Sequence, residues 1–292
     1  MKPTYRRMLS WIVLCAGIGW SACTPPGPQE DWAAEEVYTY GQEKMEKKDW
    51  LEAIQAFRIL TLNHSGSDLV DDALYHLGEA HIQIDEYGVA VVTYRRLIRD
   101  FPQSPYADEG QYRMAFSIFQ QSSPVHLTQD KTFEAIRELQ IFIDEYPNSE
   151  MTPEAHRLLQ TCLDKVAEKD YKIGHLYFKM HDWEASRLYL SEVLEEFPMS
   201  NWASKAQYDI AESYAREKKW EDAIDQYTIF VQSYFDEELQ EKAKKRLEEI
   251  RLYYAAEARK MQRDDSPDLI NGTTGTPALI KTPSNEAGSS TP

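Results

Sequence analysis

Apolar and small residues recur along this chain at two spacings, one helical and one much longer. Helical spacing is seen in runs such as Ala90, Val91, Tyr94, Leu97 and Ile98. A four-residue pattern that starts with tyrosine and ends with a small residue also recurs. Its small residues stand 37 residues apart, with one interval of 59: Gly41, Gly78, Ala115, Gly174 and Ala211. A period in this range predicts an all-α solenoid of stacked helical hairpins, a fold class that usually binds other molecules rather than catalysing reactions.

Aligned on these small residues, the repeats resemble the tetratricopeptide pattern, in which two antiparallel helices pack through small residues at positions 8 and 20. Position 20 is small here as well: Ala53, Ala90, Ala135, Ser186 and Ala223. Small side chains are needed because the two helices approach most closely at these points. An aromatic residue stands at the turn before the second helix in four repeats and is expected to fix the hairpin angle: Trp50, Tyr87, Trp183 and Trp220. We predict a superhelical solenoid of about five hairpins plus a C-terminal capping helix.

Departures from the regular period divide the repeats into two groups. Eight extra residues fall within residues 122–130 and predict a projecting loop, either a contact site or a tolerated insertion. Residues 153–179 predict one long helix that joins two halves. We assign residues 34–150 to repeats 1–3, residues 151–263 to the linking helix, repeats 4–5 and the cap, and residues 264–292 to a disordered tail. Proline is expected at the first helical position in Ser104-Pro105 and Thr152-Pro153.

The first 22 residues have the features of an export signal. A basic start is followed by an apolar run that is too short to remain as a membrane-spanning helix. The signal ends in Ser21-Ala22-Cys23, which resembles the bacterial lipobox, although Trp20 stands where that motif normally has an aliphatic residue. We expect lipid attachment at Cys23, with plain cleavage near Ala22 as the alternative. Residues 23–33 then form a proline-rich linker that holds the domain away from the bilayer.

Composition and motif content argue against several classes of function. Removal of the signal leaves 29 basic and 49 acidic residues, and this net charge of −20 argues against nucleic acid as a partner. The sequence has no phosphate-binding glycine loop, nucleophile elbow or His-Glu-x-x-His zinc motif. The scattered histidines are expected on the surface or in the groove, and the lone Cys162 in the core. We therefore expect no catalytic residue, metal or cofactor, and no enzyme activity.

The first helix of each repeat supplies candidate binding residues, because positions 2, 5, 9 and 12 line the groove of tetratricopeptide solenoids. Position 5 is tyrosine in all five repeats, and position 12 is mostly apolar. We expect a groove that takes an extended peptide with aromatic or aliphatic side chains. The alternative is that these tyrosines serve only as packing. The candidates in the first three repeats are Tyr38, Met45, Tyr75, Ile82, Tyr112 and Phe119.

The order of lipobox, three repeats, insertion, long helix and two further repeats resembles the BamD (ComL-type) family, lipoproteins of the outer-membrane β-barrel assembly machinery. The likeness covers roughly residues 34–254 and includes Phe101-Pro102-Gln103-Ser104-Pro105-Tyr106-Ala107-Asp108-Glu109, Gln129-Asp130-Lys131-Thr132 and Tyr146-Pro147-Asn148-Ser149. The resemblance implies a scaffold or adaptor on the periplasmic face of the outer membrane, held by its lipid anchor. It further implies that the C-terminal repeats bind a BamA-like insertase and other assembly-complex subunits, and that the N-terminal groove receives unfolded outer-membrane β-barrel precursors.

A periplasmic coordinator of cell-envelope function, of the kind associated with the Tol-Pal system, is the alternative. Such proteins also combine export with tetratricopeptide repeats, but they usually carry an N-terminal coiled coil and no lipid. Here no heptad segment precedes the first repeat, and Cys23 is present. The assembly interpretation is therefore preferred.

Overall fold

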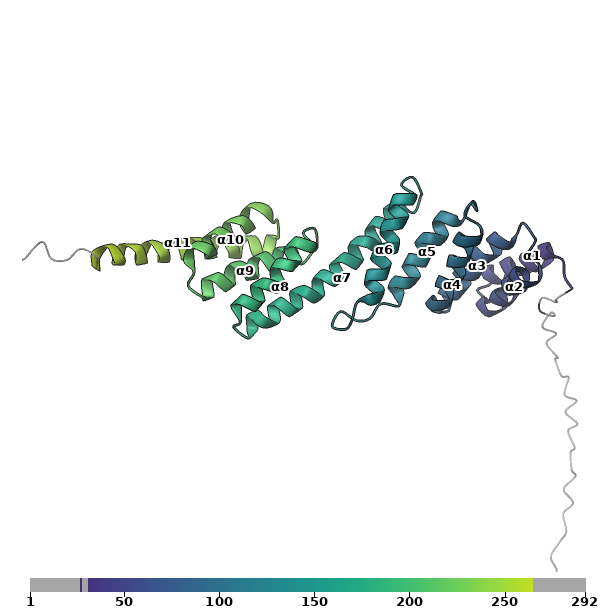
Figure 1. Cartoon of the computed structure of the whole chain (residues 1–292), viewed down its shortest axis with the longest axis horizontal. Helices are drawn as coiled ribbons and strands as arrows, with labels where there is room; N and C mark the ends of the chain where they lie inside the picture. The colour runs from purple at the N-terminus through teal and green to yellow at the C-terminus, as the bar shows by residue number, and fades with distance from the viewer. Residues whose placement is uncertain (1–26, 28–30, 265–292) are drawn as a thin grey trace, which may run out of the picture. The chain divides into compact units, whose positions relative to one another are not determined.

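The computed structural model describes Gly27 and residues 31–264, and every regular element in that part of the chain is an α-helix. The helices form successive hairpins (Figure 1). They are α1 (Ala34–Glu46), α2 (Trp50–Asn63), α3 (Val70–Gln83), α4 (Tyr87–Asp100), α5 (Ala107–Gln120), α6 (Asp130–Glu145), α7 (Thr152–Lys179), α8 (Trp183–Glu196), α9 (Ala203–Arg216), α10 (Trp220–Ser233) and α11 (Glu237–Asp264). The predicted all-α tetratricopeptide fold, with five hairpins and a terminal helix, is confirmed. The signal, Cys23 and residues 265–292 lie outside the described residues.

Contacts divide the chain into two units between Lys169 and Asp170, within α7. We call the part up to residue 169 unit 1 and the part from residue 170 unit 2. The sequence-based division falls at residue 150, before α7 begins. Consecutive helices pack against one another from α1 to α6 in unit 1 and from α8 to α11 in unit 2. The long helix predicted over residues 153–179 is α7.

The two helices of a hairpin approach closely at position 8, as predicted, and the small residues of position 20 are fully buried. A Cβ placed on Gly78 would lie 2.4 Å from Cζ of Tyr94, and one on Gly41 would lie 2.6 Å from Cε1 of Phe57. Both rings are fully buried, so neither can move aside without disturbing the core. Glycine is thus required in these two helices to let a large ring from the second helix reach the first.

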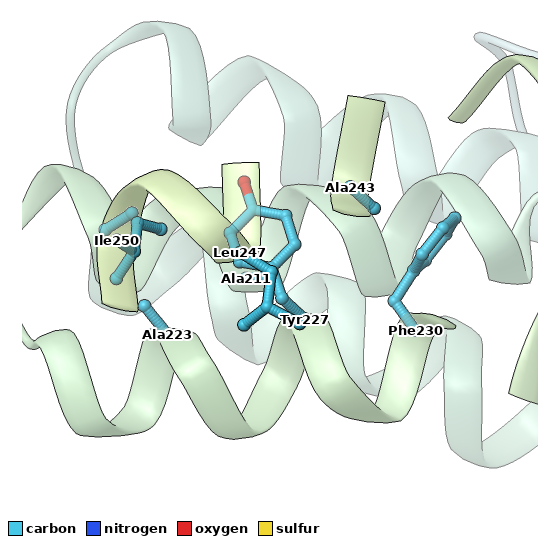
Figure 2. Close-up of a cluster of buried hydrophobic side chains, with 8 residues drawn as sticks. Ala211, Ala223, Tyr227, Phe230, Ala243, Leu247 and Ile250 are labelled. Carbon is cyan, nitrogen blue, oxygen red and sulfur yellow. The ribbon is translucent and has the colours of Figure 1, made fainter. Parts of the chain in front are cut away.

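In unit 2, the terminal helix completes the core of the last repeat. Ala223, Tyr227 and Phe230 of α10 meet Leu247 and Ile250 of α11 in one buried cluster (Figure 2). The face of α11 that packs on α10 is therefore apolar, while most of its other residues are exposed. This arrangement fits the predicted cap, which covers the apolar side of the last hairpin.

The turn inside four of the five hairpins uses a residue in the left-handed region of backbone conformation. The φ angles of Lys48, Asp85, His181 and Lys218 lie between 59° and 62°. Each of these residues stands two positions before the aromatic residue that begins the second helix. Side chains disfavour this conformation because Cβ crowds the following carbonyl oxygen. The turns are therefore built from strained positions that the sequence fills with polar residues instead of glycine.

Replacing Lys48 with glycine should stabilise unit 1 by about 0.5–1 kcal/mol. The residue has a φ of 60°, so glycine removes strain of about 1–2 kcal/mol, part of which is offset by the larger backbone entropy of glycine in the unfolded chain. Urea unfolding followed by circular dichroism measures the change. Lys47→Gly is the matched control: Lys47 has a φ of −78°, so glycine there should destabilise. A lower stability for Lys48→Gly would contradict this account of the turn.

The predicted insertion is an ordered loop held by one buried side chain. Gln129 is 2% exposed, and its Nε2 donates to carbonyl oxygens of the loop, among them those of Pro124 at 2.9 Å and Leu127 at 3.2 Å. Its Oε1 accepts from the hydroxyl of Thr132 in α6 at 2.7 Å. The amide thus ties the loop to the helix that follows. Leu127 remains 49% exposed at the surface of the loop.

The position of proline before α5 differs from the prediction. Helix α5 begins at Ala107 with Tyr106 as its N-cap, so Pro105 is not the first helical residue. The reason is a turn at Ser104, whose carbonyl accepts from the amide of Ala107 at 3.0 Å and whose hydroxyl accepts from the amide of Tyr106 at 3.2 Å. Pro153, by contrast, lies in the first turn of α7, next to its first residue.

Candidate functional site

An aromatic cluster joins the first repeats of unit 1, and two of the six candidate groove residues belong to it. Tyr38 comes from α1, Tyr75 and His76 come from α3, and Tyr106 directly precedes α5. The centroid of the His76 ring lies 6.0 Å from that of Tyr38 and 6.1 Å from that of Tyr106. Tyr75 stacks on Tyr106 with 4.5 Å between ring centroids. We call these four residues the ring cluster.

The members of the ring cluster differ in how much of each side chain solvent can reach. Tyr75 is only 8% exposed, with its ring against the buried ring of Tyr94 at 6.2 Å. Tyr38, His76 and Tyr106 are half-buried. Tyr75 therefore supports the cluster from behind, and the other three rings form the surface that a ligand could contact.

Carboxylates surround the ring cluster. Asp71 and Asp72 lie in the first turn of α3, and Glu109 lies in the first turn of α5. Burial, together with the negative charges of Asp72 and Asp71, raises the pKa of Tyr38 to about 12. Burial lowers the pKa of the His76 imidazole, which is therefore neutral at pH 7. The result is an uncharged aromatic surface with an acidic rim, suited to apolar or aromatic side chains beside a cationic group.

The other four candidate residues do not belong to the ring cluster. Two of them contact other side chains, and two lie near the ends of helices. The ring of Tyr112 lies 6.2 Å from that of Phe142 in α6. The ammonium of Lys165 in α7 lies 5.2 Å from the ring centroid of Phe119. The last two candidates are half-buried near the C-terminal ends of α1 and α3: Met45 and Ile82.

Sequence reasoning missed His76 and Tyr106, although a spacing in the sequence could have found the second. Tyr75 stacks on the residue 31 positions later, Tyr106, and in unit 2 Tyr171 packs on Trp202 at the same spacing, with 5.1 Å between ring centroids. An aromatic residue 31 positions after a position-5 tyrosine therefore marks a ring pair between repeats. No comparable signal singled out His76.

The matching place in unit 2 is occupied by a hydrogen-bonded group instead of an open aromatic surface. Nδ1 of His175 lies 2.7 Å from Oδ2 of Asp209, and the hydroxyl of Tyr171 donates to the same oxygen at 2.9 Å. Burial raises the pKa of Asp209 even though both partners favour its charged form. These side chains satisfy one another, so this part of unit 2 is a packed junction between repeats.

Position 9, expected to line the groove, carries a partly buried ionic contact in each unit. Glu79 accepts from the hydroxyl of Tyr94 at 2.5 Å, and its Oε1 lies 3.2 Å from Nε of Arg113. Glu212 accepts in the same way from Tyr227 at 2.6 Å and from Arg246 at 3.1 Å. In both units the tyrosine lies 15 residues and the arginine 34 residues after the glutamate. The glutamates therefore link successive repeats and do not face an open groove.

Two further expectations concern single side chains. Cys162 is fully buried, as predicted, and burial raises the pKa of its thiol to about 12. His81 was expected at the surface or in the groove, but it is only 5% exposed, and its Nδ1 lies 2.8 Å from Oε2 of Glu86 in the following turn. Within residues 31–264 no group of three or more histidine, cysteine, aspartate or glutamate side chains is placed to hold a metal ion.

Comparisons with known proteins place the chain in a family. The family described as "YfiO: Outer membrane lipoprotein" matches residues 30–207, and a tetratricopeptide repeat matches residues 205–234. The chain is 26% identical to the outer membrane protein assembly factor BamD of Caulobacter vibrioides over 68% of this chain and 65% of that protein. It is 22% identical to BamD of Rickettsia prowazekii over 61% of this chain and 71% of that protein.

The chain thus aligns with slightly less than two thirds of the Caulobacter relative. Among solved structures, a tetratricopeptide repeat protein of Bacteroides fragilis is 12% identical, covers 76% of this chain and 99% of that one, and has a TM-score of 0.42. None of the helices in residues 31–264 has both the length and the apolar character needed to cross a membrane. From the match over residues 30–207 and the helical hairpins that fill this range, we conclude that the chain belongs to the YfiO family of outer membrane lipoproteins.

Proposed function

We propose that this chain is an adaptor in the assembly of outer-membrane β-barrel proteins, with no reaction of its own. The observation that carries the proposal is the family match over residues 30–207. Relatives of this chain are named outer membrane protein assembly factor BamD. The fold supports it, because stacked hairpins offer long surfaces for binding other chains. The proposed partners are a BamA-like insertase, other subunits of the assembly complex and unfolded barrel precursors.

Attachment to the membrane is proposed to occur through lipid on Cys23. The sequence Ser21-Ala22-Cys23 resembles a lipobox, and the family description is that of an outer membrane lipoprotein. A lipid at this position would hold the helical hairpins at the periplasmic face of the outer membrane. Mass spectrometry of the mature chain tests this step: a mass that includes acyl chains on an N-terminal Cys23 is expected, and an unmodified N-terminus near Ala22 would contradict it.

The ring cluster is the proposed contact site for precursors. Tyr38, His76 and Tyr106 present half-buried aromatic surface, which gives large contact area at small entropic cost. Their acidic rim favours a segment that carries a positive charge beside its aromatic or aliphatic residues and disfavours an acidic one. This chemistry suits an unfolded chain whose apolar side chains have not yet found their place in a barrel.

Replacing Tyr38 with alanine should weaken binding of a peptide from the C-terminal strand of a barrel protein by about tenfold, because truncation of a central aromatic contact costs about 1–2 kcal/mol. Isothermal titration calorimetry with the purified chain measures the affinity. Phe133→Ala is the matched control, because this residue is 53% exposed on α6 outside the ring cluster. Tyr75 is unsuitable for the test, because replacing this buried residue would also destabilise unit 1, and a loss of binding could not then be assigned to a lost contact. Equal affinities for wild type and Tyr38→Ala would contradict the proposed site.

Purification of the native protein from solubilised membranes tests the function as a whole. The proposal expects the barrel insertase among the proteins recovered with it. Recovery of Tol components without the insertase would instead support the alternative of a cell-envelope coordinator. A point substitution in the ring cluster should leave recovery of the insertase unchanged, because that contact is proposed to lie in the C-terminal repeats.

A further inference from the structure

The outward face of the second helices differs sharply in charge between the two units. Four positions of each second helix point outward. Counted from the small residue at position 20, they are residues −2, +2, +5 and +9. In unit 1 all twelve such positions are exposed. They hold one acidic residue, Asp144, and four arginines. The arginines are Arg58, Arg95, Arg99 and Arg137. In unit 2 the eight equivalent positions hold no basic residue and four acidic ones: Glu184, Glu195, Glu221 and Asp225.

This concentration of positive charge runs against the composition of the whole chain, whose formal net charge is −17. Among the described residues, Arg58, Arg95 and Arg137 form no ion pair within the chain, whereas Arg99 pairs with Asp100 at 2.7 Å. Three of the four guanidinium groups are therefore available for a partner outside the chain. Because charges farther away than about 10 Å are screened at physiological salt, the acidic residues that oppose the local field are close neighbours such as Asp100 and Glu138, and more distant ones contribute little.

Large apolar side chains lie among these arginines. Leu51 and Leu62 on α2 are 72% and 65% exposed, Val92 on α4 is 64% exposed, and Phe133 on α6 is 53% exposed. Two hollows cross this surface. One, of about 510 Å³, follows α2, and the other, of about 380 Å³, lies between α2, α3 and α4 and includes Glu86 in its lining; both are lined by Arg58 and Leu62. The surface thus combines guanidinium groups with apolar residues, the composition that suits the boundary between lipid headgroups and acyl chains.

We propose that this outward face of α2, α4 and α6 binds the anionic phospholipid surface of the membrane to which the chain is anchored. Charge complementarity selects an anionic partner. The length of the linker selects a membrane, because Cys23 and the first residue of α1 are eleven residue steps apart, which cannot span more than about 40 Å. The identity of the membrane rests on the proposed lipid anchor. The contribution of the arginines to vesicle binding does not depend on that anchor. An electrostatic contact at this face would add to the anchoring that the acyl chains on Cys23 provide.

Vesicle binding tests the proposal without any assembly partner. The chain without signal and anchor, residues 24–292, retains every described residue. We expect it to co-float with vesicles of 30% phosphatidylglycerol in phosphatidylcholine, and not with phosphatidylcholine alone. Replacing Arg58, Arg95 and Arg137 with glutamine should weaken this binding about a hundredfold, at roughly fivefold for each basic residue near the surface. Half-molar salt should reduce wild-type binding similarly.

A control variant has the same net charge as the arginine variant but leaves the outward face of α2, α4 and α6 unchanged. Lys245, Arg259 and Lys260 are exposed on α11 of unit 2, and replacing these three with glutamine should leave vesicle affinity within twofold of wild type. The proposal is overturned if wild type shows no preference for anionic vesicles, or if both triple variants lose affinity equally. It is also overturned if the arginine variant keeps vesicle binding but loses a protein partner on purification. Failure of any of these tests leaves the assembly function intact, because recovery of the insertase is measured separately.

Discussion

Replacing Phe230 with alanine is expected to lower the free energy of unfolding of unit 2 by about 4 kcal/mol. The side chain is fully buried where α10 meets α11, and its ring lies 5.7 Å from that of Tyr234 and 5.8 Å from that of Tyr208. Truncation removes these contacts and leaves a cavity in the cluster shown in Figure 2. Because the surrounding side chains of α9 and α11 are already packed, they can collapse into the space only in part.

Hydrogen exchange measured by mass spectrometry at increasing urea concentration reports on this loss. Exchange resolves α10 and α11 from unit 1, which matters because a repeat array need not unfold in one step. Ile229→Ala is the matched control: this neighbouring residue is 43% exposed, so its truncation should cost less than about 1 kcal/mol. Protection in unit 1 should be unchanged in both variants. Similar losses for Phe230→Ala and Ile229→Ala would show that α11 does not cap the stack as described.

The second large effect is expected at Glu212, whose replacement with alanine should destabilise unit 2 by about 3 kcal/mol. Its carboxylate accepts from the hydroxyl of Tyr227 at 2.6 Å, from Arg216 at 2.7 Å and from Arg246 at 3.1 Å. Removing it leaves a buried hydroxyl and a partly buried guanidinium without their acceptor, which is the costly way to break such a contact. The expected loss of about 3 kcal/mol is near the low end for breaking a buried ion pair, because the side chain of Arg246 is about a third exposed.

The pH dependence of Glu212→Gln separates the charge from the packing. Burial by itself would raise the pKa of Glu212, but the hydrogen bonds from Tyr227 and Arg216 and the charge of Arg246 outweigh it and hold the pKa below the unfolded value of 4.5. The stabilisation from the charged form is therefore complete above pH 4.5 and is lost as the pH falls through the lower folded value. The stability difference between wild type and Glu212→Gln, measured by urea unfolding, should shrink between pH 6 and pH 3. A difference that grows on acidification would contradict the assignment.

Most of the fold follows from spacing in the sequence, because each hairpin repeats one packing solution. The 37-residue interval between Gly41 and Gly78 predicts the hairpins, and the small residue at position 8 marks a close approach of their two helices. The long helix α7 follows from the break in that interval. The left-handed turn residues could not be predicted, because lysine carries no signal for positive φ and the enrichment of aspartate and histidine in that region is too weak to single out one turn position.

The candidate site was only partly predictable because position in a repeat does not fix exposure. Tyr38 and Tyr75 share position 5, yet one is half-buried and the other is 8% exposed, since Tyr75 is covered by Tyr106. Position 9 was expected in the groove, but Glu79 and Glu212 bond to tyrosines 15 residues later. Such contacts depend on which residues neighbouring repeats supply, and the pattern of a single repeat does not contain that information.

Depletion of this protein from its host, followed by measurement of folded outer-membrane barrels, tests the central claim most directly. The amount of folded barrel is read from the heat-modifiable mobility of barrel proteins in gels, with a plasmid copy of the wild-type chain as the rescue control. An assembly adaptor predicts that folded barrels fall while their unfolded precursors accumulate, and that the plasmid copy restores both. Unchanged levels of folded barrels after full depletion would contradict the account.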